Sequence, residues 1–265
     1  MRKTIVQLYE IQDPREAERL VEMGVDHIGS VLLSLEGWKV PAIRDVCRLV
    51  GSSPAKSSLI PLFTGADDIL RALDYYQPAL VHFCELIPLA ASDQARREAC
   101  LADLVRTQER VKREFPPVGI VRSIPVPAAA PADPAPAREA ILQIVRSLGP
   151  HSDFFMTDTL RGSVEGGDTQ PVEGYVGITG ETCDWELAAA LIEASPIPLI
   201  LAGGIGPENA FEAVSRLRPA GIDSCTRTNA RDPLGRPVRF RKDLERVRRL
   251  LDEVERAEEG LRAAR

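Results

Sequence analysis

The stretch from Pro196 to Asn229 contains a glycine pattern that suits the binding of an anionic group. Its apolar run, 197–202, leads into Gly203 and Gly204, and a segment with helical spacing follows. Glycines between a strand and a helix let an anion approach backbone N–H donors. The pattern therefore indicates a candidate phosphate site, with a simple tight turn as the alternative. We expect Pro207 to be the first helical residue, where its missing N–H would be unpaired anyway.

Three further side chains stand at the ends of apolar runs and could act as acid or base. Asp158 follows the predicted strand 153–157, and Tyr9 and Glu10 end the predicted strand 4–10. Partial burial can raise the pKa of a carboxylate toward neutrality, which suits general acid–base catalysis. Alternation along a strand puts Tyr9 and Glu10 on opposite faces, so at most one of them points inward. For Asp158, a role as a cap or turn residue is the alternative.

Three other residues at strand ends carry side chains that can bind or react. Cys84 has the sequence context of a small buried hydrophobic residue rather than a nucleophile, since no histidine partner is evident. Arg122 and Arg227 could each bind a phosphate or a carboxylate through two N–H groups. Exposure on the surface is the commoner situation of an arginine, and it remains the alternative for both.

The elements that position these residues alternate strictly between strand and helix. This alternation predicts an α/β protein with a parallel sheet, and eight units favour a single (β/α)8 TIM barrel over 1–265. An open dinucleotide-binding sheet is disfavoured, because the first strand–helix turn lacks G-x-G-x-x-G. The predicted strands are 4–10, 27–33, 58–63, 79–84, 117–122, 153–157, 197–202 and 220–224, and the predicted helices are 14–23, 42–50, 67–76, 92–112, 137–148, 185–194, 207–217 and 239–261.

Two segments interrupt the alternation. The Pro/Ala-rich residues 125–136 are predicted to form an extended surface loop rather than a linker, because the alternation resumes after them. The Gly-rich residues 160–181 have little periodicity, and loops of that length in compact domains often carry function. Active sites of (β/α)8 barrels lie at the carboxyl ends of the strands, and this loop follows such an end. We therefore predict that it closes over the substrate as a lid.

Composition limits the classes of partner. The chain has 265 residues, of which 44% are apolar and 27% charged, as in globular proteins. Its net charge of −6 argues against a nucleic acid or an anionic membrane as partner. No apolar run reaches the roughly 18 residues of a membrane helix, and five dispersed cysteines suit a reducing, cytoplasmic setting. Three separated histidines make a His-rich metal site improbable.

The motifs together resemble a known family, the phosphoribosylanthranilate isomerases. Residues 179–185, TGETCDW, and the following LILAGGIGPENA are similar to that family's G-T-G-K-T-F-D-W and L-A-G-G-L-x-P-x-N pair. The resemblance implies a (β/α)8 fold and an Amadori rearrangement of an aminoaldose phosphate to an aminoketose, with no cofactor. It also implies that Asp158 is the general acid. The residues that would bind the substrate and its phosphate are Gly180, Gly203, Gly204, Cys225 and Thr226.

The chain departs from the family pattern at positions that matter. Tyr9 replaces the cysteine base, and Cys84 replaces the histidine after strand four. Arg227 stands where the family has glycine, so it fills the phosphate pocket or adds a cation to it. Lys39 ends a Gly-Trp-Lys segment where the family has S-P-R, whose arginine would meet the anthranilate carboxylate. The loop lysine of the family is replaced by Glu181.

Three functions follow from this pattern. The first is acid–base isomerisation of a phosphorylated sugar-like small molecule by a diverged, isomerase-like barrel. The second is phosphoribosylanthranilate isomerase activity itself, with Glu10 or Tyr9 as a replacement base. The alternative is a non-catalytic or regulatory phospho-ligand-binding protein that kept the barrel. The expected ligand is a phosphorylated small molecule, and the expected assembly is a monomer or a homodimer.

Overall fold

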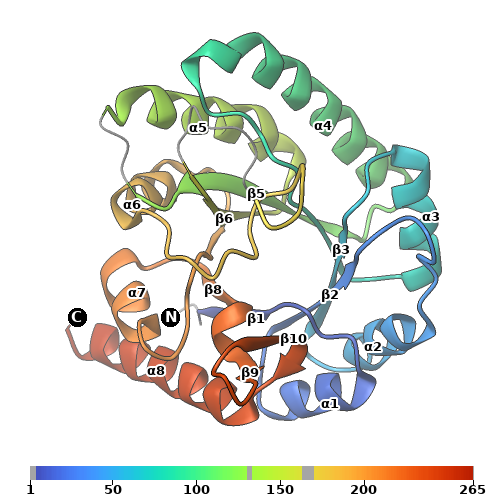
Figure 1. Cartoon of the computed structure of the whole chain (residues 1–265), viewed down its shortest axis with the longest axis vertical. Helices are drawn as coiled ribbons and strands as arrows, with labels where there is room; N and C mark the ends of the chain where they lie inside the picture. Colours follow the sequence, from blue (N-terminus) through green and yellow to red (C-terminus); the bar gives the residue numbers. More distant parts are fainter. Residues whose placement is uncertain (1–3, 130–132, 163–169, 265) are drawn as a thin grey trace.

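Eight parallel strands close into a barrel in the computed structural model, which describes residues 4–129, 133–162 and 170–264 (Figure 1). Their order around the barrel follows the sequence, and β8 pairs with β1 to close it. The predicted (β/α)8 TIM barrel is therefore confirmed. The strands are β1 (Ile5–Leu8), β2 (His27–Leu32), β3 (Lys56–Pro61), β4 (Leu80–Phe83), β5 (Gly119–Pro127), β6 (Phe154–Leu160), β7 (Leu199–Leu201) and β8 (Gly221–Ser224).

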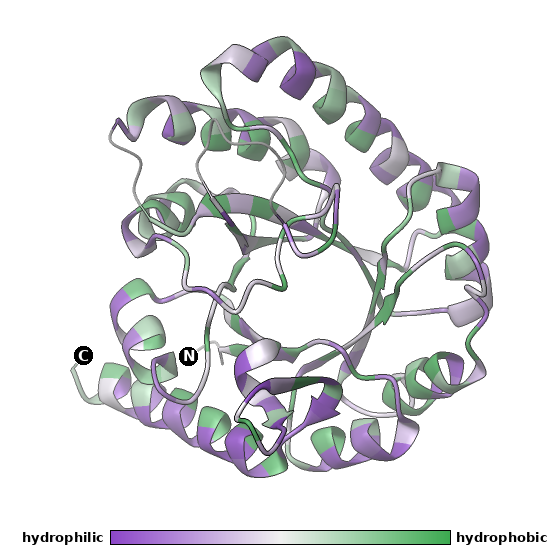
Figure 2. Ribbon diagram, in the orientation of Figure 1, coloured by the Kyte–Doolittle hydropathy of each residue, from purple (hydrophilic) through white to green (hydrophobic). Residues whose placement is uncertain are grey.

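Helices surround the barrel, with their hydrophobic sides toward the strands and hydrophilic sides toward solvent (Figure 2). Two buried clusters fill the space between strands and helices, and a third, which includes Tyr9, Cys84 and Met156, lies inside the barrel. The helices are α1 (Pro14–Glu22), α2 (Pro41–Gly51), α3 (Ala66–Tyr76), α4 (Gln94–Glu114), α5 (Ala135–Leu148), α6 (Trp185–Ala194), α7 (Ala210–Leu217) and α8 (Leu244–Ala263), with 3-10 turns η1 (Ala91–Asp93), η2 (Gly149–His151) and η3 (Thr226–Thr228).

Side-chain caps hold the starts of three of the described helices, and one predicted helix start is wrong. Asp13 caps α1, Asp184 caps α6 and Asp243 caps α8. Pro207 is not the first residue of a helix, because α7 begins only at Ala210. The Asn209 side chain accepts a hydrogen bond from the Gly206 N–H at 2.9 Å and donates one to the Gly204 carbonyl at 3.0 Å. These two bonds hold residues 204–209 in a turn, which delays the helix.

Strand β5 extends further than predicted and shortens the expected loop 125–136. It pairs with β6 from Val121 to Pro127, whereas its pairing with β4 ends at Arg122. The Ala128 N–H donates to β6, so the missing N–H groups of Pro125 and Pro127 face the side that β4 has left. Prolines are tolerated in strands at such unpaired edges.

The region after β8 contains a hairpin that the sequence reading had assigned in part to the last helix. Strands β9 (Asn229–Arg231) and β10 (Pro237–Lys242) pair antiparallel, and α8 starts at Leu244 with Asp243 as its cap. The turn is stabilised by the Asp232 carboxylate, which accepts backbone bonds from Leu234 and Arg236. The hairpin supplies Arg239, whose guanidinium pairs with Glu10 just after β1.

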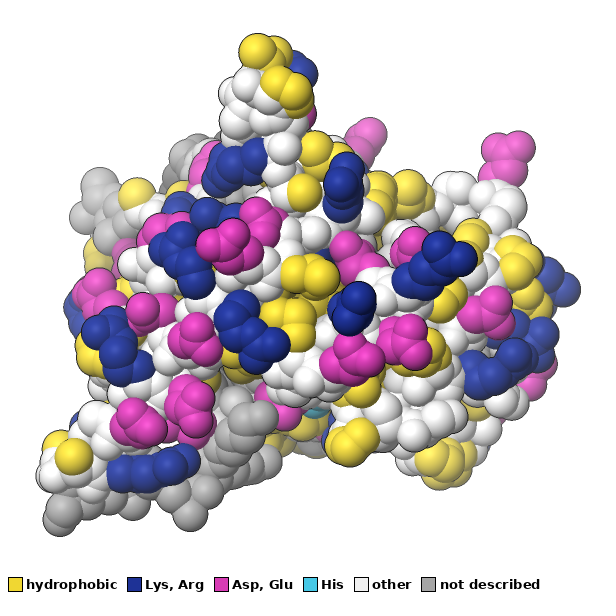
Figure 3. All heavy atoms as spheres, turned by 90° about the horizontal axis from the view of Figure 1, so that it is seen from below, with side chains coloured by type: hydrophobic (Ala, Val, Ile, Leu, Met, Phe, Trp, Pro, Cys, Tyr) yellow, Lys and Arg dark blue, Asp and Glu magenta, His cyan; other side chains and the backbone are white. Residues whose placement is uncertain are grey.

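The outer surface is mixed in charge. On the face shown in Figure 3, Lys and Arg side chains are interspersed with Asp and Glu. Pairs such as Arg246–Glu208 and Arg256–Glu253 account for part of this pattern. Among the residues that the structure describes, no helix is long and apolar enough to cross a membrane.

Gly29 on β2 creates the space for the Tyr9 ring inside the barrel. A Cβ atom at Gly29 would lie 2.0 Å from Tyr9 Cδ1, closer than any real contact. Tyr9 and Gly29 therefore form a matched pair, in which a missing side chain on one strand admits a ring from its neighbour. A residue larger than glycine at this position must displace the ring.

We expect Gly29→Ala to lower the free energy of unfolding by about 1–3 kcal/mol, because the added methyl overlaps a buried ring. Urea unfolding measures the change. Gly260→Ala in α8 is the control, since nothing lies within 4 Å of the added carbon there. That control should be neutral or stabilising by up to about 1 kcal/mol. Equal stabilities of the two variants would contradict the packing argument.

Candidate active site

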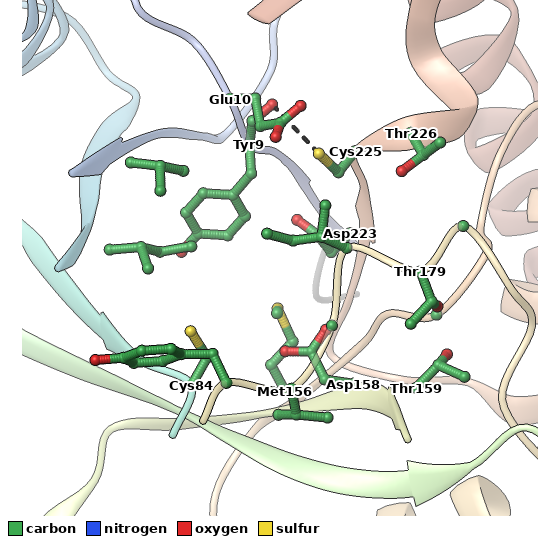
Figure 4. Close-up of a pocket in the computed structure, with 18 of the residues that line it drawn as sticks. Tyr9, Glu10, Cys84, Met156, Asp158, Thr159, Thr179, Asp223, Cys225 and Thr226 are labelled. Atoms are coloured by element: carbon green, nitrogen blue, oxygen red, sulfur yellow. Dashed lines mark hydrogen bonds between the residues drawn. The ribbon is translucent and has the colours of Figure 1, made fainter. Parts of the chain in front are cut away.

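A pocket opens at the carboxyl ends of the strands, where barrels of this class place their sites. Figure 4 shows Asp158 and Asp223 in the middle of this pocket, with Tyr9 and Cys84 to one side and Thr159, Thr179 and Thr226 to the other. The predicted site residues Glu10, Gly180, Gly203, Gly204, Cys225 and Arg227 also line it.

Asp158 lies on β6 itself, with only 9% of the residue exposed. Ser123 on β5 donates a hydrogen bond to its Oδ2 atom. Gly177 passes so close that a Cβ there would lie 2.6 Å from Asp158 Oδ1. Burial raises the pKa of Asp158 well above its ordinary value, and the nearby Asp223 raises it further. A carboxyl in this setting keeps its proton to a higher pH than an exposed carboxyl does, which suits a general acid.

Asp223 on β8 is the second buried carboxyl of the pocket, and the sequence reading did not select it. Gln7 Nε2 donates to Asp223 Oδ1 at 3.2 Å, and Gln7 Oε1 lies 3.0 Å from His27 Nδ1. Burial raises the pKa of Asp223 to about 7, although the hydrogen bond from Gln7 and the nearby positive charge of Lys242 both lower it. The sequence contains a feature that could have identified Asp223, because this acid, two residues after Gly221, interrupts an otherwise apolar strand.

A chain of hydrogen bonds crosses the floor of the pocket and ends at Asp158. Tyr9 Oη lies 2.7 Å from Ser58 Oγ and 2.9 Å from His82 Nδ1, and His82 Nε2 lies 2.7 Å from Ser123 Oγ. Burial lowers the pKa of His82 to about 3, so its ring is neutral and carries one N–H. When the Ser123 hydroxyl donates to Asp158, its oxygen must accept a hydrogen bond from His82 Nε2–H. The other ring nitrogen of His82, Nδ1, must then accept from the Tyr9 hydroxyl. Protonation of Asp158 at Oδ2 would reverse every donor in the chain.

The two residues at the end of β1 point in different directions. Tyr9 points inward, and burial raises the pKa of its hydroxyl well above 10, so the hydroxyl stays protonated. Glu10 has a φ of 68° and is 1% exposed. Its Oε1 accepts from Arg239 Nε at 2.6 Å, and its Oε2 lies 3.4 Å from Asn229 Nδ2. The Glu10 carboxylate is thus engaged by the β9–β10 hairpin, across the pocket from Asp158 (Figure 4).

Three loops converge beside Asp158, as the glycine pattern predicts for an anion site. A Cβ on Gly204 would lie 2.7 Å from the Thr182 nitrogen, and a Cβ on Gly180 would lie 3.2 Å from Thr226. Among the described residues, none accepts a hydrogen bond from the N–H of Gly203 or Gly204. Arg227 lines the same part of the pocket, and its buried Nε has no partner among the described residues.

The cysteines of the pocket are thiols rather than thiolates. Burial raises the pKa of Cys84 well above its ordinary value, and burial likewise raises the pKa of Cys225. Cys84 packs in the cluster inside the barrel. Reaction as a nucleophile would require the thiolate. Both cysteines are therefore wall residues of the pocket.

Arg122 does not lie in the pocket, which corrects the expectation that it contacts a ligand. Its side chain is fully buried on the outside of the barrel, where its guanidinium lies 2.5 Å from Glu85 and stacks 4.9 Å from the centre of the Phe83 ring. Its Nε also donates to Gln108 at 2.9 Å. The alternation along β5 explains this, because Ser123 points inward and its neighbour must point outward.

The described part of the Gly-rich segment, residues 170–181, forms one wall of the pocket. The Val176 N–H donates to the Cys84 carbonyl at 2.9 Å, and the Leu86 N–H donates to the Gly174 carbonyl at 2.9 Å. Residues 163–169 lie outside the described residues, so the lid function stays a prediction. Within the described part of the chain, no group of three or more His, Cys, Asp or Glu side chains is arranged to hold a metal ion.

The fold and the pocket define an α/β-barrel protein in which two buried acids share a pocket with glycine-rich turns. Residues 140–226 match the family model of N-(5'-phosphoribosyl)anthranilate isomerase. The enzyme of that name from Methanothrix thermoacetophila is 26% identical over 92% of this chain and 98% of its own. The chain is thus similar to phosphoribosylanthranilate isomerases in part of its sequence and over nearly its whole length in alignment.

Solved structures show the same fold. The isomerase from Pyrococcus furiosus superimposes with a TM-score of 0.64 at 18% identity, over 96% of this chain and 99% of its own. A phosphoribosyl anthranilate isomerase in complex with reduced 1-(o-carboxyphenylamino)-1-deoxyribulose 5-phosphate superimposes with a TM-score of 0.60 at 17% identity, over 95% and 98% of the two chains.

We expect Asp223→Asn to stabilise the protein at alkaline pH. The pKa of Asp223 rises from 3.8 to about 7 on folding, so its contribution to stability falls as pH increases from about 4 to about 7. Removing the buried charge should raise the free energy of unfolding at pH 8 by on the order of 2–4 kcal/mol, and by almost nothing at pH 4. Urea unfolding at both pH values measures this, with exposed Asp103→Asn as the control. A gain that is independent of pH would contradict it.

Proposed function

We propose that this chain catalyses the acid–base isomerisation of a phosphorylated aminoaldose to an aminoketose, an Amadori-type rearrangement. The observation that carries the proposal is the pair of buried carboxyls, Asp158 and Asp223, facing one pocket beside a glycine-lined anion cradle. Burial raises both pKa values, and the hydrogen-bond partners of the two carboxyls differ, which suits one acid and one base. Similarity to the isomerases supports the same reaction class.

In this mechanism Asp158 is the general acid. It gives its proton to the ring oxygen, the C1–O bond breaks, and the nitrogen lone pair forms a C1=N bond. Asp223 then takes the proton from C2, and the electrons of that bond form C1=C2 while the iminium becomes an amine. Tautomerisation returns a proton to C1 and leaves a ketone at C2, so the product is an isomer of the substrate. The pKa of about 7 keeps Asp223 available as a base near neutral pH.

Asp223 takes the place that the sequence reading offered to Tyr9 or Glu10. The Tyr9 hydroxyl has a raised pKa and is bonded to Ser58 and His82, so it serves as a donor and not as a base. The Glu10 carboxylate is paired with Arg239. We assign Tyr9 and His82 a positioning role, since they act on Asp158 only through Ser123.

The phosphate is expected at the cradle. The free N–H groups of Gly203 and Gly204 can bind phosphate oxygens, and Arg227 adds a cation that pairs with phosphate through two N–H groups. Gly180 and Thr226 close the other side of this space. A related isomerase has been solved with a phosphorylated ligand, which supports a ligand of this class. Whether the protein is a monomer or a homodimer stays a prediction.

A non-catalytic or regulatory phospho-ligand-binding protein is the second candidate. It is favoured by Tyr9, which occupies the position of the family's cysteine base. Such a protein would be stabilised thermally by phosphorylated ligands without turning any of them over. Turnover of any phosphorylated aminoaldose would exclude it.

We expect Asp158→Asn to reduce turnover of phosphoribosylanthranilate at least about 100-fold, because an amide cannot deliver the proton. Binding of a reduced, unreactive analogue of the product, measured by titration calorimetry, should persist, because the substitution leaves the phosphate cradle unchanged. Asp252→Asn on the exposed face of α8 is the control and should keep full activity. Unchanged turnover in the Asp158 variant would refute the assignment of the acid.

We expect His82→Phe to move the alkaline limb of the kcat–pH profile upward by about one pH unit. Ser123 lowers the pKa of Asp158 by donating to it, and without the His82 N–H this donor is weaker. The acid limb near pH 7, set by Asp223, should stay in place. His82→Gln keeps a donor and an acceptor and should restore the profile. A fall in kcat with both limbs unmoved would indicate a merely structural role.

A further inference from the structure

The pocket has two chemically different ends. Gly203, Gly204 and Arg227 form the cradle end. The opposite end is a continuous apolar wall that belongs to, or packs against, the buried cluster inside the barrel. This apolar wall comprises Val31, Ile60, Leu62, Val172, Tyr175 and Val176. In Figure 4, Asp158 and Asp223 lie between Cys84 on one side and Thr179 and Thr226 on the other. A ligand with its phosphate in the cradle therefore directs its other end to the apolar wall.

Positive charge is confined to the cradle. Arg227 is the only Lys or Arg among the described residues that line the pocket, and residues 163–169 contain neither. The neighbouring cations are engaged elsewhere: Arg239 with Glu10, Arg122 with Glu85, and Lys242 with the Cys225 carbonyl at 2.9 Å and Asn229 at 2.6 Å. No cation is left to meet an anion at the apolar wall.

Acidic side chains, by contrast, lie close to that wall. Asp158 and Asp223 face the centre of the pocket. A carboxylate placed there would lose its water without gaining a partner, and it would be repelled by any ionised acid nearby. An uncharged apolar group would gain from the same burial.

We propose that the substrate of this chain is a phosphorylated aminoaldose whose amine carries an uncharged apolar substituent, aromatic or aliphatic, in place of a carboxylated ring. This inference rests on the proposed isomerase function and specifies its substrate. The phosphate binds at the cradle, the reacting carbons lie between Asp158 and Asp223, and the amine substituent packs on the apolar wall. The reaction itself is unchanged, because the substituent takes no part in the proton transfers.

The test compares two reduced product analogues that cannot react, one with a phenylamino group and one with an ortho-carboxyphenylamino group. Titration calorimetry should show the phenylamino compound binding at least about tenfold more tightly, a difference of about 1.4 kcal/mol. Equal or tighter binding of the carboxylated compound overturns the inference. Failure of both compounds to bind overturns the inference and the proposed function together.

Turnover separates the two proposals. The matching phosphoribosylamines, made from aniline and from anthranilate, are supplied to the enzyme, and product formation is followed by phosphorus NMR. Tighter binding of the phenylamino analogue without turnover of either amine supports the apolar selectivity and refutes the isomerase function. Turnover of both amines with preference for the anthranilate compound supports the isomerase function and refutes the selectivity.

A matched pair of variants tests whether the lack of a cation at the apolar wall causes the preference for the phenylamino analogue. Leu62→Arg places a cation in the apolar wall and should reverse the preference in favour of the carboxylated analogue. Leu35→Arg makes the same change at a residue that is 40% exposed outside the pocket, and should leave the preference as it is. Circular dichroism confirms that each variant is folded. If both variants shift the preference equally, charge in the pocket is not its cause, and the inference fails.

Discussion

Closure of the barrel between β1 and β8 is the constraint on which the site depends. Four residue pairs, from Ile5–Gly221 to Leu8–Ser224, join the first strand to the last. This register places Gln7 beside Asp223 and brings the end of β1 to the start of the hairpin that follows β8. Because the strands are parallel, all their carboxyl ends meet at one mouth, and residues far apart in sequence share one pocket.

Burial of acids gives the pocket its chemistry. Asp158 and Asp223 sit among apolar walls, so their charged forms are poorly solvated and their pKa values rise. The surrounding hydrogen bonds then differentiate them. Asp158 ends a chain that runs through Ser123 and His82, whereas Asp223 is held by Gln7. Two identical side chains thereby acquire different proton affinities, which is the physical requirement for an acid and a base in one site.

Much of the architecture could be predicted because its causes are local. Apolar runs and the strict alternation of elements indicated the barrel, and the glycines after β7 indicated a candidate cradle. The errors arose where hydrogen bonds that no periodic pattern encodes intervene. Pro125 and Pro127 are predicted to lie in a loop, but they continue β5, because β4 ends before them and leaves that edge of β5 unpaired. Pro207 is predicted to begin a helix, but the Asn209 side chain holds residues 204–209 in a turn, and α7 begins only at Ala210.

The sequence by itself determined the fold class, because strands and helices alternate with a regular period, and it made Asp158 and the glycines after β7 candidate site residues, because they stand in contiguous motifs. Only the tertiary structure decided where side chains point and what they touch. It turned Arg122 out of the barrel, paired Glu10 with Arg239, tied Tyr9 into a buried chain and set Asp223 beside Asp158. The reason is physical: proton affinity depends on burial and on partners from other strands, and these exist only once the barrel has closed.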